Sequence, residues 1–374
     1  MCGIVGYIGT QNAVPYLIEG LSKLEYRGYD SAGIAINIDN QLKIFKTKGR
    51  LKNLEEILDP NAKSVIGIGH TRWATHGAPS NLNAHPHLNQ SETIAVIHNG
   101  IIENYMEIKE WLIKDKKVTF KSETDSEVIA HLVDYFYEGD LLDAVYKAVD
   151  RMIGAYAIGV ISKDEPNRLV AVRKDSPLIV GLGENENFIA SDIPALLKYT
   201  RNMLLIENDE FVDLTKDKVT IYNSLRQPVE REVFKVTWDI DSAEKEGFEH
   251  FTLKEIFEQP KGVKETVLRR LNNKDEIVLE GVNFDAEILK NINKIYIVAC
   301  GTAYHAGLIG RRAIEQFAKI PVECDVASEF RYRDPFVDDK TLFIAVSQSG
   351  ETLDTLQSLR EAKRKGARIL SIVN

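Results

Sequence analysis

The sequence predicts an α/β protein whose two parts differ in architecture. Up to about residue 237, many short apolar runs broken by glycine accompany only a few segments of helical periodicity. So many strands with so few helices favour stacked sheets flanked by helices over a doubly wound fold. From about residue 258 onward, strands and helices alternate regularly, which predicts a parallel sheet with short turns.

In the first part, the expected strands are short and rich in β-branched and apolar residues. They are residues 3–9, 31–38, 64–75, 92–100, 154–162 and 168–174. Helices are expected at residues 13–26 and 126–149, where apolar residues recur at spacings of three and four.

In the second part, strands are expected at residues 294–299, 321–326, 341–347 and 368–373, and helices at 303–319 and 352–366. Residues 241–260 are charged, end in proline and predict a linker that runs into a helix. Four parallel strands with no following helix would leave apolar faces uncovered, so this domain is expected to be incomplete. The expected domains are residues 2–237 and 263–374, joined by a linker at 238–262.

Composition restricts the class of protein. With 374 residues, 44% hydrophobic and 28% charged, the chain is typical of globular proteins, and its net charge of −9 argues against general binding of nucleic acid or anionic membranes. The longest apolar stretch, at 152–162, is too short to span a bilayer. Three cysteines without a C-x-x-C pair fit a reducing compartment, so a cytoplasmic protein is expected.

A cysteine stands directly after the initiator methionine. Chain ends gain little from packing a thiol, so reactivity explains this position better. If Met1 is removed, Cys2 carries a thiol and an α-amine, with unperturbed pKa values of about 8.5 and about 7.7–8.0, and so holds a nucleophile together with its base. For Cys2 alone, a buried terminal cysteine is the simpler interpretation, but three further segments favour chemistry.

The first segment is His98-Asn99-Gly100, which follows an apolar run. A side-chain amide beside a glycine amide can present two N–H donors to one oxygen, as an oxyanion hole requires. The alternative is a turn that ends the strand, because Asn-Gly is a common hairpin signal.

The other two segments, GHTRWATHG and SETDSE, suggest binding groups for the carboxylate and the amino group of an amino acid. Arg72 carries a planar fork suited to a carboxylate, with Thr75 and His76 as nearby donors; a solvated arginine on a strand edge is the alternative. Asp125 could hold an amino group; alternatively, Thr124, Asp125 or Ser122 could cap the following helix. Together with the thiol and the paired amides, these groups are what is needed to hydrolyse the side-chain amide of a free amino acid such as glutamine.

A second candidate site lies at SQSGET, from Ser347 to Thr352, between an expected strand and an expected helix. Hydroxyls and amides at a helix N-terminus bind anions, and the carboxyl end of a parallel strand is the usual place for a ligand. The segment lacks the lysine and glycine spacing of a Walker loop, which favours a sugar phosphate over a nucleoside triphosphate. A simple turn with a hydroxyl cap is the alternative. Residues 299–307, ACGTAYHAG, end the preceding strand in the same manner.

These segments resemble a known family. MCGIVGYIG, YRGYDSAG, HTRWATHG, HNGIIENY and SETDSE are similar to the glutaminase domain of the N-terminal-nucleophile (Ntn), class II glutamine amidotransferases. YRGYDSAG and HTRWATHG in particular resemble the glutamine–fructose-6-phosphate aminotransferases, also called glucosamine-6-phosphate synthases. SQSGET and ACGTAYHAG resemble a sugar-isomerase (SIS) domain. The resemblance covers the whole chain and implies an αββα stacked-sheet domain followed by an incomplete, flavodoxin-like SIS domain.

The resemblance implies a role for each matching position. Cys2 would be the nucleophile and its α-amine the base, and Asn99 and Gly100 would form the oxyanion hole. Arg27 and Tyr29 would shape the glutamine pocket or support the structure. The glutamine-binding residues would be Arg72, Trp73, Thr75, His76 and Asp125, with Trp73 also near the gate of an ammonia passage or, alternatively, an ordinary buried aromatic. The sugar-phosphate-binding residues would be Thr302, Ser347, Gln348, Ser349 and Thr352.

The resemblance also implies a reaction in which L-glutamine and fructose 6-phosphate give L-glutamate and glucosamine 6-phosphate. It implies no metal or organic cofactor and a homodimer of the full-length enzyme. The family's isomerisation residues belong to a part that this chain lacks, so glutamine hydrolysis is the activity expected here. The alternatives are an amidohydrolase for another amide and a sugar-phosphate-binding regulatory fragment without catalysis. His85 and His87 could hold a metal, but a loop role is favoured, and Cys300 is expected to be a small packed residue.

Overall fold

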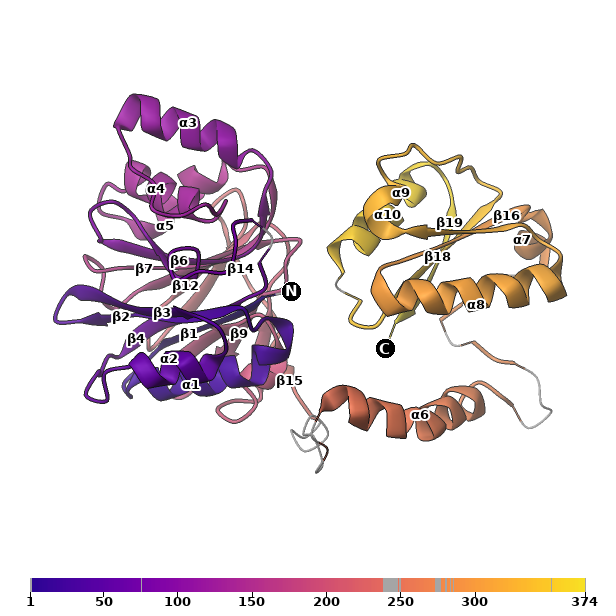
Figure 1. Cartoon of the computed structure of the whole chain (residues 1–374), viewed down its shortest axis with the longest axis horizontal. Helices are drawn as coiled ribbons and strands as arrows, with labels where there is room; N and C mark the ends of the chain where they lie inside the picture. The colour runs from indigo at the N-terminus through magenta and orange to yellow at the C-terminus, as the bar shows by residue number, and fades with distance from the viewer. Residues whose placement is uncertain are drawn as a thin grey trace. The chain divides into compact units, whose positions relative to one another are not determined.

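The chain forms two compact units, Met1–Glu244 and Lys245–Asn374, in a computed structural model (Figure 1). The structure describes residues 2–74, 76–237, 248, 250–272, 277–279, 281, 282, 284, 286–350 and 352–373. Most of the first half of the expected linker at 238–262 therefore lies outside the described residues. Its second half belongs to helix α6 (Phe251–Leu268), which runs through Pro260 rather than beginning after it.

The first unit contains two stacked antiparallel sheets. One has the strand order β15-β11-β9-β10-β1-β4-β2-β3 and the other β14-β13-β12-β8-β7-β6-β5. The first sheet is built from β1 (Gly3–Ile8), β2 (Ser31–Ile38), β3 (Gln41–Lys48), β4 (Ile66–Arg72), β9 (Ile179–Leu182), β10 (Asn187–Ala190), β11 (Asn202–Leu205) and β15 (Phe234–Lys235). The second is built from β5 (His87–Leu88), β6 (Ile94–Ile102), β7 (Gly154–Ser162), β8 (Leu169–Lys174), β12 (Glu210–Leu214), β13 (Val219–Tyr222) and β14 (Pro228–Val229).

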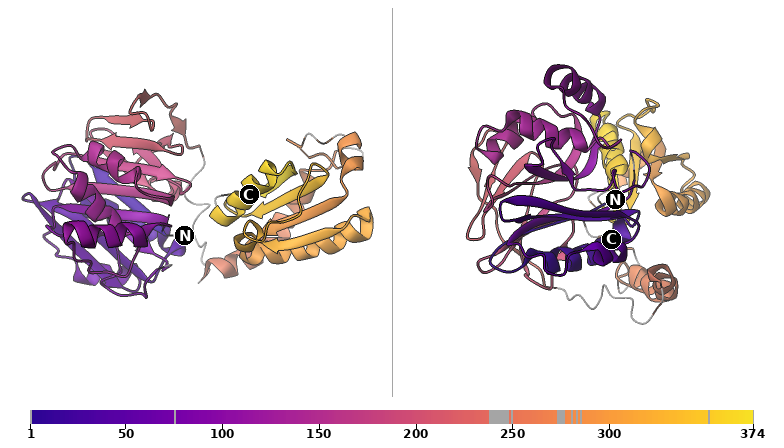
Figure 2. Two further views of the ribbon diagram at one scale, coloured as in Figure 1. Left: turned by 90° about the horizontal axis from the view of Figure 1, so that it is seen from above. Right: turned by 60° about the vertical axis from the view of Figure 1, so that its left-hand side comes forward.

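Helices cover the outer face of each sheet. The first sheet carries α1 (Ala13–Leu24) and α2 (Leu51–Ile57), and the second carries α3 (Tyr105–Lys116), α4 (Glu127–Phe136) and α5 (Leu141–Val149). Figures 1 and 2 show the resulting layers, helices outside and two sheets inside. A third apolar core fills the space between the sheets. The expected αββα architecture is confirmed.

The helices differ in detail from the expectation. The single helix expected at residues 126–149 is two helices, because Gly139 adopts a positive φ of 98° and Asp140 caps the second helix by accepting from the N–H of Leu142 at 3.0 Å. Helices α2 and α3 were not predicted. The helix expected at 13–26 ends at Leu24 and continues as a 3₁₀ turn over Glu25–Arg27.

The second unit has one parallel sheet of the order β17-β16-β18-β19. Its strands are β16 (Lys294–Ala299), β17 (Val322–Val326), β18 (Thr341–Ser347) and β19 (Arg368–Val373). Its helices are α7 (Ala286–Asn291), α8 (Gly301–Ala318), α9 (Ala327–Phe330) and α10 (Leu353–Arg364). Helix α8 lies on one face of the sheet, and α9 and α10 lie on the other (Figure 1). Each set of helices contributes residues to an apolar core against its face.

The faces of this sheet are therefore better covered than expected, and the most exposed apolar residues of its strands lie on the last strand. Ile372 and Val373 on β19 are 53% and 54% exposed. The chain leaves β16 toward α8 on one face and leaves β18 toward α10 on the other, so the strand order reverses between these two strands. Such a switch point is where open α/β sheets bind ligands. No helix within the described part of the chain is both long and apolar enough to span a bilayer.

Candidate active site

Cys2 lies at the start of a central strand. It directly precedes β1, whose six residues are all buried and which pairs with β4 on one side and β10 on the other. The Cys2 Sγ accepts a hydrogen bond from the N–H of Trp73 at 3.2 Å. Burial raises the pKa of the Cys2 thiol, while the hydrogen bond from Trp73 acts in the opposite direction. This end of the chain is tied into the sheet, and its thiol needs a base to react at neutral pH.

Asn99 and Gly100 lie inside β6 and not after it, so the alternative interpretation, a turn that ends the strand, is wrong. They pair with Ala157 and Tyr156 of β7. The Nδ2 of Asn99 donates to the carbonyl oxygen of Cys2 at 3.0 Å, which joins the two sheets at this point. Gly100 has a φ of 130°, and a Cβ there would lie 1.9 Å from the carbonyl oxygen of Ala155. Only glycine fits at position 100.

Arg72 ends β4 and is only 4% exposed. The alternative interpretation, a solvated arginine on a strand edge, is therefore also wrong. Its Nη2 donates to the carbonyl oxygens of His76 and Gly77, the latter at 3.1 Å. Its Nη1 is buried and has no hydrogen-bond partner within the described part of the chain. A buried, unpaired guanidinium nitrogen is suited to an incoming carboxylate. Thr75 lies outside the described residues.

Asp125 connects its own loop to β6. Its Oδ2 accepts from the N–H of Ile102 at 2.9 Å, and its Oδ1 lies 4.0 Å from the Nδ1 of His76. The N-cap of α4 is Ser126 and not Asp125, so the helix-cap interpretation is wrong. The carboxylate is buried between the end of β6 and the loop that follows Arg72.

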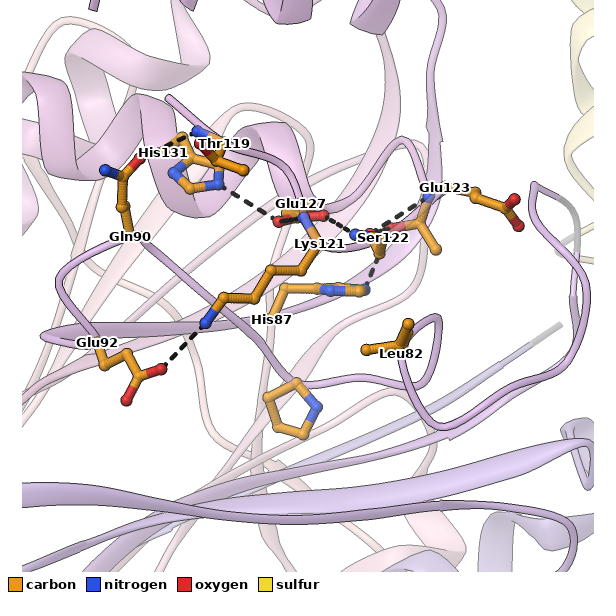
Figure 3. Close-up of polar contacts among 12 residues, drawn as sticks. Leu82, His87, Gln90, Glu92, Thr119, Lys121, Ser122, Glu123, Glu127 and His131 are labelled. Atoms are coloured by element: carbon orange, nitrogen blue, oxygen red, sulfur yellow. Dashed lines mark hydrogen bonds and ion pairs between the residues drawn. The ribbon is translucent and has the colours of Figure 1, made fainter. Parts of the chain in front are cut away.

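A buried carboxylate that sequence analysis missed fixes the segment before Asp125. Figure 3 shows Glu127 between Ser122 and His131. Glu127 accepts from the backbone N–H groups of Lys121 at 2.7 Å and Ser122 at 2.6 Å, and contacts His131 at 3.4 Å. Burial alone would raise the pKa of Glu127, but these hydrogen bonds outweigh burial and lower it to about 2. The sequence signal was a glutamate four residues before a histidine on a largely apolar helix.

The histidines of NAHPHL are buried: His85 lies in the loop before β5, and His87 is the first residue of that short strand. The ring of His85 stacks on His70 with centroids 4.1 Å apart and meets His87 edge-on at 4.5 Å. The Nδ1 of His85 accepts from the N–H of His98 at 3.3 Å. Within the described residues, no group of three His, Cys, Asp or Glu side chains is arranged as a metal site.

The aromatic residues beside Cys2 are exposed. Trp73 is 49% exposed and packs edge-on against Tyr29 at 5.3 Å, so it is not an ordinary buried aromatic. Arg27 instead is buried and pairs with Asp192 at 2.5 Å. Of the two roles left open for Arg27, this ion pair favours structural support.

In the second unit, the two expected anion-binding segments follow neighbouring strands. Val298 of β16 pairs with Ala345 of β18, so the start of α8 after Cys300 and the loop after Ser347 leave the sheet at the same edge. Thr302 lies in the first turn of α8, and Thr352 is the N-cap residue of α10.

The SQSGET loop contains a short hydroxyl network. The buried Ser347 Oγ accepts from the N–H of Gly350 at 3.1 Å and lies 3.3 Å from the Oγ1 of Thr352. Gln348 and Ser349 are exposed on the same loop. The half-buried Cys300 packs against the apolar core under α9 and α10.

Comparisons with known proteins agree with this division. Residues 70–198 match the model of the glutamine amidotransferase domain, and residues 288–374 match that of the SIS domain. The fold is similar to that of glutamine phosphoribosylpyrophosphate amidotransferase from Bacillus subtilis, with a TM-score of 0.56 and 16% identity over all of this chain and 81% of that one.

Relatives of much higher identity are named glutamine–fructose-6-phosphate aminotransferase [isomerizing]. The protein of Clostridium perfringens is 61% identical over the whole of this chain and 61% of its own length. That of Clostridium tetani is 58% identical over the whole of this chain and 62% of its own length. The chain thus spans about three fifths of the length of these relatives. Over its whole length, the chain is similar to the glutamine–fructose-6-phosphate aminotransferase family.

Proposed function

We propose that the first unit hydrolyses the side-chain amide of L-glutamine, with Cys2 as the nucleophile after removal of Met1. One observation carries the proposal. Three strands bring a thiol, a side-chain amide and a guanidinium to one end of the space between the sheets, at Cys2, Asn99 and Arg72. These groups match the three demands of the substrate, which are attack on the amide carbon, stabilisation of its oxygen and recognition of its carboxylate.

The proposed reaction begins with transfer of the Cys2 thiol proton to the α-amine of the same residue. The thiolate attacks the amide carbon, and the Nδ2 of Asn99 and the N–H of Gly100 stabilise the oxyanion. The C–N bond breaks, the α-ammonium returns its proton to the departing ammonia, and the acyl group stays on sulfur as a thioester. Water hydrolyses the thioester to L-glutamate, with the α-amine again as the base.

Substrate binding would use the remaining groups of this site. The buried Nη1 of Arg72 would meet the α-carboxylate, while Asp125 would hold the ammonium group with help from His76 and Thr75. Trp73 would lie near the exit for ammonia. The unpaired Arg72 Nη1 favours a free amino acid over a simple amide, which argues against the alternative amidohydrolase.

We further propose that the second unit binds the phosphate of fructose 6-phosphate through Thr302, Ser347, Gln348, Ser349 and Thr352. The match to the SIS domain and the position of these residues at the switch point support this proposal. With the remaining part of the longer relatives, the protein would transfer the ammonia to the sugar and form glucosamine 6-phosphate. A regulatory fragment that binds the sugar without catalysis is the competing proposal.

The domain boundaries proposed are 2–237 and 263–374, with the linker between them. A homodimer of the full-length protein and a cytoplasmic location are proposed as well. Three free cysteines support a reducing location.

The test combines intact mass with release of L-glutamate from L-glutamine by the purified chain. We expect the mass of the chain without Met1, and glutamate release that falls by at least about 10³-fold in Cys2→Ala, because the nucleophile is lost. A chain that lacks Met1, binds fructose 6-phosphate and releases no glutamate would contradict the proposal and support the regulatory fragment.

A further inference from the structure

A histidine that sequence analysis passed over holds the side chain of Asn99. His70 lies on β4, two residues before Arg72, and is almost completely buried. Its Nε2 is 2.9 Å from the Oδ1 of Asn99 and 3.1 Å from the carbonyl oxygen of His98. The contact reaches from the first sheet to the second, because β4 and β6 belong to different sheets.

The hydrogen-bond partners determine which ring nitrogen carries the proton. The carbonyl oxygen of His98 only accepts, so the Nε2 of His70 must be a donor. The atom of Asn99 that faces this donor must then be Oδ1. The same orientation follows from the opposite end of the amide, because the Nδ2 of Asn99 meets the carbonyl oxygen of Cys2, which also only accepts. Both ends of the amide therefore agree.

The surroundings keep the His70 ring neutral and fixed. Burial lowers the pKa of His70 to about 3, and the stacked ring of His85 lies on one of its faces. His85 is itself held by the N–H of His98. The Nδ1 of His70 is buried and has no hydrogen-bond partner within the described residues, which fits a ring that carries its single proton on Nε2.

We propose that His70 is a positioning residue for glutamine hydrolysis: its Nε2–H holds the Oδ1 of Asn99, so that the amide N–H groups face Cys2 and the developing oxyanion. The proposal rests on the proposed function of the first unit. Without this bond, the amide can rotate about its last torsion, which is broad and roughly two-fold. A rotated amide would present oxygen to the oxyanion and lose the stabilisation of the transition state.

The first test compares His70→Phe, which keeps a flat ring without a donor, with His70→Gln, which restores an N–H near the position of Nε2. For His70→Phe we expect kcat for glutamate release to fall by about 10- to 100-fold, with KM for glutamine nearly unchanged, since the lost interaction acts in the transition state. His70→Gln should recover most of this loss. Alkylation of Cys2 by iodoacetamide, which forms no oxyanion, should proceed in both variants at the wild-type rate.

The control is Ser64→Ala. Ser64 stands just before the other end of β4, and its buried hydroxyl lies 2.6 and 2.7 Å from the carbonyl oxygens of Asn37 and Ile66, to one of which it donates at a time. Its loss should lower stability and leave kcat unchanged. A wild-type kcat in folded His70→Phe, or an equal loss of hydrolysis and alkylation, would overturn the positioning role.

A second measurement reads the His70 proton without any substrate. In ¹⁵N-labelled chain, with the His70 signal identified by its loss in His70→Gln, we expect a neutral ring protonated on Nε2 from pH 5 to 8. A ring protonated on Nδ1, or one that titrates in this range, would overturn the proposal. If the wild-type chain released no glutamate, the proposed function would fail, and this measurement would still decide whether His70 orients Asn99.

Discussion

The two candidate sites of this chain are assembled in different ways. In the first unit, Cys2, Arg72, Asn99 and Asp125 come from segments that span more than a hundred residues, and the last three of these side chains are buried. In the second unit, most of the expected site is one hexapeptide that joins β18 to α10, and two of its side chains, Gln348 and Ser349, are exposed. The first site thus depends on the packing of two sheets, and the second on the local geometry of a strand, a turn and a helix start.

This difference has an energetic consequence. A buried polar group that loses its partner costs about 1–3 kcal/mol, and more if it is charged, whereas an exposed group can turn to water. Substitutions should therefore have larger effects at the first site than at the second. The following predictions test this order, beginning with the largest effect.

Arg72→Ala should lower kcat/KM for glutamine hydrolysis by about 10²-fold, mainly through KM, because a charge-assisted contact to the α-carboxylate is lost. Arg72→Lys should recover only part of the loss, since an ammonium group lacks the planar fork. Steady-state kinetics on variants whose thermal unfolding shows a folded chain would check this. An unchanged KM in Arg72→Ala would mean that Arg72 only supports the loop at His76 and Gly77.

The stability of Glu127→Gln as a function of pH tests the hydrogen bonds that fix the segment before Asp125. Because the pKa of Glu127 is lowered from 4.5 to about 2 on folding, its ionised form contributes stability above pH 4.5, and this contribution is lost as the pH falls through 2. At neutral pH the contribution is about 3 kcal/mol at most. Urea unfolding at several pH values should show a lower free energy of unfolding for Glu127→Gln than for wild type at pH 7, and this difference should shrink toward pH 3.

The matched control for that series is Glu92→Gln. Glu92 pairs with Lys121 on the surface, and such pairs contribute little. Its effect on unfolding should be small at every pH. If the loss of unfolding free energy in Glu127→Gln stayed constant from pH 7 to pH 3, the ionised Glu127 would not be the source of the stability.

Ser347→Ala should have the smallest effect. It removes the hydroxyl that accepts from Gly350, and we expect the affinity for fructose 6-phosphate to fall about tenfold, which corresponds to about 1.4 kcal/mol. Calorimetric titration of the whole chain would measure it. Ser358→Ala is the control, because Ser358 lies later on α10 and donates to the carbonyl oxygen of Ala327. Equal affinities for Ser347→Ala and wild type would place the phosphate elsewhere.

The contrast between local and long-range structure also explains how far the sequence predicted the fold. The expected strands 31–38 and 154–162 agree with β2 and β7 residue for residue, because their apolar runs end at clear polar or glycine boundaries. The break between α4 and α5 was missed, since the apolar periodicity continues across Gly139 and only the backbone shows the interruption. Helix α3 was missed because its polar residues weaken the helical pattern.

For the site, the residue types were predictable but their supports were not. The motifs contain Cys2, Arg72 and Asn99, and the structure brings these residues together. The bond between His70 and Asn99 joins two sheets, and the role of Glu127 depends on a loop that folds back onto its own helix. The spacing of Glu127 and His131 marks a pair on one helix face, but neither periodicity nor spacing encodes the bonds to Asn99 or to the loop before the helix, which only the structure shows.

The most direct test of the central claim is to ask which of the three free cysteines reacts with a glutamine analogue that carries a diazoketone in place of its amide. Peptide mapping by mass spectrometry would locate the label. We predict one label per chain, on Cys2, formed more slowly in the presence of L-glutamine and absent from Cys300 and Cys324. A label on Cys300 or Cys324, or a chain without Met1 that stays unlabelled, would contradict the assignment of Cys2 as the nucleophile.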